Sequence, residues 1–82
     1  MLPVKFDAYN DRDKWIGYAR KNLNGGYDCF LFRDGGTTPS DDAIISDYPA
    51  AVRWFRDRAA VSFTRIFNSR LDNSLTCSLA NL

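Results

Sequence analysis

The segment ISDYPAAVRWFRDR, residues 45–58, decides the fold of this chain because it carries a complete set of helix signals. Ser46 or Asp47 can cap a helix, since short polar side chains accept hydrogen bonds from the first free backbone N–H groups. Pro49 suits the first helical turn, where its missing N–H removes no hydrogen bond. These signals predict a helix from residue 47 to about residue 59.

Two aromatic residues stand side by side in this helix, and only one of them can face the core. A rotation of about 100° per residue gathers one apolar arc toward the rest of the fold. Its members are Tyr48, Ala51, Val52, Phe55 and Ala59. Trp54 lies off this arc and near Arg58. Its ring either makes a local cation–π contact with Arg58 or anchors a binding partner.

Five other segments have the alternation, the β-branched residues or the apolar density that predict strands. They are residues 2–8, 27–33, 43–45, 61–67 and 75–79. The second segment is apolar on both faces, which predicts an interior position in the sheet. The fourth also fits a continuation of the preceding helix to Leu71, and its β-branched and aromatic residues favour the strand.

Residues 11–24 predict a further helix, with Asn10 or Asp11 as its cap, because four apolar residues follow a helical spacing. These residues are Trp15, Ile16, Ala19 and Leu23. The alternative is a β-hairpin over residues 14–33 that turns at Asn24–Gly25.

The expected order is therefore β-α-β-β-α-β followed by a C-terminal strand. This order predicts one α+β domain over residues 1–82, with two helices on one face of an antiparallel sheet. A ferredoxin-like split βαβ sandwich is the simplest architecture for it.

The composition argues against an enzyme. The chain has no His, Glu or Gln, and all ten acidic residues are Asp, so the usual general base and the Ser-His or Cys-His pairs are absent. We expect no catalytic residue and no cofactor. We expect no metal site either, because Cys29 and Cys77 supply only half of a zinc ligand set. We leave open whether these two cysteines pair.

The first residues show no secretion signal, and no apolar run has the length of a membrane span. We therefore expect a cytoplasmic protein with no membrane partner. The net charge of +1 is weak for a general nucleic-acid binder.

These observations favour a non-enzymatic protein-binding module. By analogy of size and fold class alone, the chain resembles the small phage or mobile-element inhibitors of the anti-CRISPR and anti-restriction type, which occlude a host protein complex. We expect the host partner to contact an arginine-rich helix face. Its candidate residues are Trp54, Arg53, Arg56 and Arg58, with Tyr18 as a weaker candidate.

Two alternatives stay open. Phe30 and Phe32 share one face of their strand and Arg33 ends it, which suits stacking of single-stranded nucleic acid on a sheet. The same two rings equally suit the floor of a core. A homodimer that buries Trp54 or a sheet edge is the other alternative.

Overall fold

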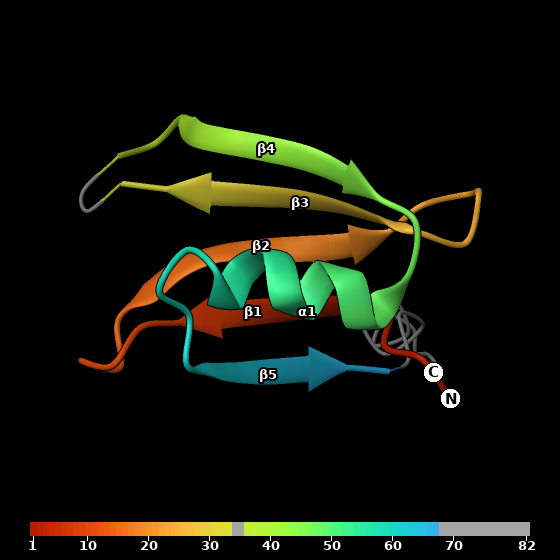
Figure 1. Cartoon of the computed structure of the whole chain (residues 1–82), viewed down its shortest axis with the longest axis horizontal. Coiled ribbons are helices and arrows are strands. Elements are labelled where there is room, and N and C mark those ends of the chain that lie inside the picture. Colours follow the sequence, from red (N-terminus) through yellow and green to blue (C-terminus); the bar gives the residue numbers. More distant parts are fainter. Residues whose placement is uncertain (34–35, 68–82) are drawn as a thin grey trace, which may run out of the picture.

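The computed structural model describes residues 1–33 and 36–67. These residues form a five-stranded antiparallel sheet, in the order β4-β3-β2-β1-β5, with one helix across one face (Figure 1). The elements are β1 (Lys5–Tyr9), β2 (Trp15–Lys21), β3 (Tyr27–Phe32), β4 (Pro39–Ile45), α1 (Tyr48–Arg56) and β5 (Ser62–Ile66). The α+β class and the antiparallel sheet are confirmed. The predicted strand 75–79, with Cys77, lies outside the described residues.

The ferredoxin-like order is not confirmed, because the elements of the described residues follow another order. Strands β1 to β4 form an antiparallel meander, and α1 then carries the chain from β4 across the sheet to β5, which pairs with β1. Figure 1 shows α1 lying in front of the middle of the sheet. One helix, rather than two, thus covers the sheet in the described part of the chain.

The helix predicted over residues 11–24 is wrong, and the alternative hairpin is confirmed. β2 pairs with β1 on one side and β3 on the other. Asn10 and Asn22 hold the two turns, because each side-chain oxygen accepts two backbone N–H bonds, at 2.9–3.1 Å. Asn caps helices by the same chemistry, which is why Asn10 also predicted a helix start.

Close packing of α1 against β2 explains why the helical spacing of residues 11–24 led to a wrong prediction. A β-carbon on Gly17 would meet the carbonyl oxygen of Phe30 and lie 3.1 Å from the ring of Phe55. The inward positions of β2 are therefore small, Gly17 and Ala19, and both are buried. The aromatic residues of β2, Trp15 and Tyr18, lie among the rings of the other face, whereas the prediction placed Trp15 in the core.

The helix predicted from residue 47 is confirmed as α1, and it begins where predicted. Asp47 accepts a hydrogen bond from the Ala50 N–H at 2.8 Å, and Pro49 occupies the first turn. Phe55 is fully buried, as predicted. The helix ends at Arg56, earlier than predicted, because the chain turns into a left-handed conformation at Ala59 (φ 83°).

The other strands agree in place but not always in length. β5 confirms the strand predicted over 61–67, and β3 is an interior strand as predicted. β4 begins at Pro39, four residues earlier than the short strand expected from residue 43. Its polar first half pairs with β3 by backbone hydrogen bonds, which a pattern of apolar residues does not reveal.

Phe6 lies at the centre of the core and is fully buried. Four rings surround it at centroid distances of 5.6–5.7 Å, all tilted or edge-to-face. They are Tyr27, Tyr48, Phe55 and Phe63. Such aromatic pairs stabilise beyond their buried area, by about 0.5–1.5 kcal/mol each. The core therefore joins β1, β3, α1 and β5 through one side chain.

Truncating Phe6 will destabilise the fold more than any surface change. We expect Phe6→Ala to lower the free energy of unfolding by about 3–5 kcal/mol, and Phe6→Leu to lower it by less, so that the variant stays measurable. Leu23→Ala, at a fully exposed position, serves as the control and changes it by less than about 0.5 kcal/mol. Urea unfolding followed by circular dichroism measures all three. A Phe6→Leu variant as stable as the control would contradict the central role of this ring.

A substitution at the end of α1 should stabilise the protein. The Ala60 N–H donates to the Phe55 carbonyl at 3.0 Å and the Ala59 N–H donates to the Arg56 carbonyl at 3.2 Å, the bonds of a Schellman motif. Its left-handed position usually holds Gly, so Ala59→Gly should raise the free energy of unfolding by about 0.5–1 kcal/mol. Ala50→Gly inside α1 should lower it by about 1 kcal/mol. Thermal unfolding measures the change in stability for both variants. If both substitutions change the free energy of unfolding in the same direction, this explanation of the helix end is wrong.

Alkaline pH will destabilise the protein through two buried groups. Burial raises the pKa of the Cys29 thiol to about 12, aided by Asp28 and opposed by Arg58. Burial, with a contribution from Tyr48, also raises the pKa of Tyr27, whose hydroxyl donates to the Pro3 carbonyl at 2.5 Å.

Above the ordinary thiol pKa of 9.0, the unfolded chain loses a proton that the native state keeps. The free energy of unfolding should therefore fall as pH rises from 9 toward 12. Urea unfolding at about pH 7, 9 and 10.5 measures the slope. Cys29→Ala should make the slope shallower, and an unchanged slope would contradict the role of the thiol.

Candidate functional site

The sheet face opposite α1 carries a cluster of aromatic side chains. We call it the aromatic face and define it by Trp15, Tyr18, Phe30 and Phe32, from β2 and β3. Tyr18 pairs directly with Phe30 across the two strands. None of the four rings is fully buried, and Trp15 is 43% exposed. No described helix or strand covers this face (Figure 1).

The rings of the aromatic face lie against one another. Trp15 is 5.1 Å from Phe32 and 6.3 Å from Tyr18, which is in turn 5.2 Å from Phe30 and 6.1 Å from Phe32. The interplanar angles are only 18–35°, so the rings lie more nearly parallel than the edge-to-face rings of the core. The four rings therefore form one continuous cluster across β2 and β3.

Charged side chains contact three rings of the aromatic face. The Lys5 ammonium lies 5.3 Å from the centre of the Tyr18 ring, and the Arg20 guanidinium lies 5.7 Å from that of Phe30. The Trp15 indole N–H donates to Asp7 at 2.9 Å, which fixes the orientation of the ring. The ion pairs of Lys5 with Asp7 and of Arg20 with Asp28 are long, at 3.9 and 4.0 Å.

A hollow of about 260 Å³ adjoins one end of the aromatic face. Trp15 and Phe32 form one part of its wall, and Arg12, Lys14 and Asn10 form another. Basic side chains thus lie near both ends of the cluster of rings. This combination suits ligands that carry both flat rings and negative charge.

The residues of the predicted arginine-rich helix face lie in different environments in the structure. Trp54 is half-buried against the core, 4.9 Å from Phe55. The Arg58 guanidinium lies 4.1 Å from the centre of the Trp54 ring, donates to its backbone carbonyl and donates to Asp41 at 3.0 Å. The local cation–π interpretation is confirmed, and Trp54 and Arg58 are largely engaged within the fold.

The remaining predicted residues lie in two other places. Arg53 and Arg56 are exposed and line a groove between α1 and β5. Tyr18, the weakest candidate, lies on the opposite side of the sheet in the aromatic face. The five residues therefore do not form one surface.

Trp15 was not predicted as a site residue because its spacing placed it in the core-facing stripe of a helix. The missed signal is the order of polar and apolar residues in WIGYARK, residues 15–21, in which Gly17 and Ala19 alternate with Tyr18 and Arg20. Small residues that alternate with larger ones predict a strand whose small side packs closely against another element.

No three His, Cys, Asp or Glu side chains gather into a metal site within residues 1–33 and 36–67. Cys29 is fully buried beneath α1 and protonated at neutral pH, so its thiol does not act as a surface nucleophile. In the same residues, no helix is both long and apolar enough to cross a membrane.

The chain matches no protein-family model, no curated protein and no solved structure.

Proposed function

We propose that this protein binds single-stranded nucleic acid on the aromatic face. The observation that carries the proposal is the platform of four contacting rings on β2 and β3, opposite the helix. Bases stack on such rings with a gain of about 1–3 kcal/mol each, without a need for base-specific hydrogen bonds. The spacing of the rings on neighbouring strands lets successive bases stack along the sheet.

The charges around the rings suit a ligand bound mainly by stacking. Lys5 and Arg20 are the two cations that lie over rings of this face, and Asp7 and Asp28 offset part of their field. With about two phosphates neutralised, affinity for a single strand should fall only about sevenfold between 50 and 200 mM salt. A strongly basic groove would lose far more.

A protein partner is a second proposal for the same face. Trp15, Tyr18 and Arg20 are the residue types that dominate binding hot spots, and a low net charge suits a protein surface. In this proposal the chain is an occluding inhibitor of a host complex, as size and fold class suggested. Its anchor is Trp15 rather than Trp54, because Trp54 is covered by Arg58.

Titration with short labelled oligothymidine and oligouridine tests the first proposal. We expect Trp15→Ala and Phe30→Ala each to weaken binding by about 1–3 kcal/mol, since each removes one stacking surface. Fluorescence anisotropy measures the affinity. In a Trp54→Phe background, Trp15 is the only tryptophan of the chain, and its fluorescence should be quenched by the stacked base.

A matched pair of lysine variants separates the two sheet faces. Lys5→Ala should weaken binding and reduce the salt slope. Lys21→Ala should do neither, because Lys21 pairs with the buried Tyr27 and projects toward the helix side. The proposal fails if neither oligonucleotide binds, or if the Trp15 and Phe30 variants bind like the wild type. Capture of a defined host protein by the wild type but not by Trp15→Ala would then support the second proposal.

A further inference from the structure

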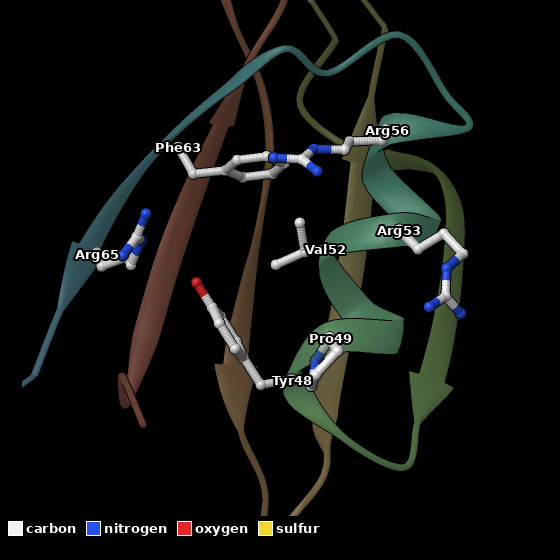
Figure 2. Close-up of a pocket in the computed structure, with 7 residues that line it drawn as sticks. All are labelled: Tyr48, Pro49, Val52, Arg53, Arg56, Phe63 and Arg65. Atoms are coloured by element: carbon white, nitrogen blue, oxygen red, sulfur yellow. The ribbon is translucent and has the colours of Figure 1, made fainter. Parts of the chain in front are cut away.

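A groove between α1 and β5 forms a second hollow, on the helix side of the sheet. Its volume is about 460 Å³, within the range of small-molecule sites. Figure 2 shows Val52 projecting into this space from α1, with Phe63 and Arg65 of β5 across from it. The Tyr48 hydroxyl is directed into the same space from the start of the helix.

The groove concentrates positive charge far beyond the average of the chain. Arg53, Arg56 and Arg65 line it and no acidic residue does, whereas the whole chain has a net charge of only +1. Within the described residues, none of the three arginines forms an ion pair. Arg53 and Asp57 do not pair, although their spacing on one helix would permit it.

The three arginines differ in their positions and contacts at the groove. The Arg56 guanidinium lies 5.8 Å from the centre of the Phe63 ring, which holds it beside the groove. Arg65 stands opposite Phe6 in the β1–β5 register, on the side covered by α1. Arg53 is part of the lining, but Figure 2 shows its side chain on the side of α1 away from Phe63 and Arg65, so it lies at the edge of the groove. Two arginines thus approach one space from a helix and a strand.

Guanidinium groups recognise phosphate through paired N–H donors, and they do so more strongly than neutral donors. The apolar wall formed by Val52, Phe63 and Pro49 offers contact to an uncharged ring system. The volume admits a phosphate together with such a body, and the lack of acidic residues removes the main repulsion. A phosphate group attached to a small organic molecule fits both halves of the groove.

We propose that the α1–β5 groove binds a phosphomonoester of nucleotide size, with its phosphate between Arg56 and Arg65 and its organic body against Val52 and Phe63. Arg53 attracts the anion from the rim. The Tyr48 hydroxyl donates a hydrogen bond to the ligand. This site lies on the other side of the sheet from the aromatic face, and it does not depend on the function proposed for that face.

Adenosine monophosphate is the probe that tests the site, with adenosine and inorganic phosphate as its two halves. Isothermal titration calorimetry at constant ionic strength should show adenosine monophosphate binding at least about tenfold more tightly than either half. Backbone amide shifts in NMR should change over α1 and β5. Arg56→Ala and Arg65→Ala should each weaken binding about tenfold. Arg65→Lys should recover only part of the loss, because it keeps the charge but not the fork.

Two control variants keep the test separate from nucleic-acid binding. Arg12→Ala removes an exposed arginine outside the groove, and Trp15→Ala removes a ring of the aromatic face. Both should bind adenosine monophosphate like the wild type. The proposal is overturned if adenosine binds as tightly as its phosphate, if the arginine variants bind normally, or if the shifts appear on β2 and β3. Preference for an acidic peptide over adenosine monophosphate would overturn it as well, in favour of a protein ligand.

Discussion

The packing of Phe6 against four rings is the interaction on which the rest of the structure depends. These rings come from β3, from both ends of α1 and from β5. Because they must meet on one side of the sheet, α1 has to cross that side between β4 and β5. A single short helix is then enough to bury the centre of the sheet, and no described helix or strand covers the opposite side.

This one-sided core explains where the two proposed binding surfaces lie. The inward side of β2 has room only for Gly17 and Ala19 beneath the helix. The large rings of β2 and β3 consequently stand on the other side, where they contact one another rather than the core. On the helix side, the crossover brings Arg56 of α1 and Arg65 of β5 to the lining of one groove. Two chemically distinct surfaces follow from one packing arrangement.

The sequence predicted the structure correctly where the chemistry of neighbouring residues decides the local conformation. The Asp47 cap, the Pro49 start and the buried Phe55 follow from the order of residues in a single helix. It failed for residues 11–24, because Asn10 serves a turn as well as a cap and the apolar spacing was compatible with both. Trp54 was predicted as the anchor rather than Trp15 because the helical spacing placed Trp15 in a core, and because the contact that holds Arg58 to Asp41, seventeen residues away, is not visible in the sequence. The ring of Trp54 is covered as a result.

The sequence by itself determined the helix and its cap, the strand character of residues 27–33 and 61–67, and a composition without His or Glu. These properties depend on neighbouring residues or on counts alone. Only the tertiary structure decided which side of β3 faces the core, because both of its sides are apolar and the position of α1 selects between them. It also decided that Trp15, Tyr18, Phe30 and Phe32 share one surface, since strand pairing brings together residues that are distant in the chain.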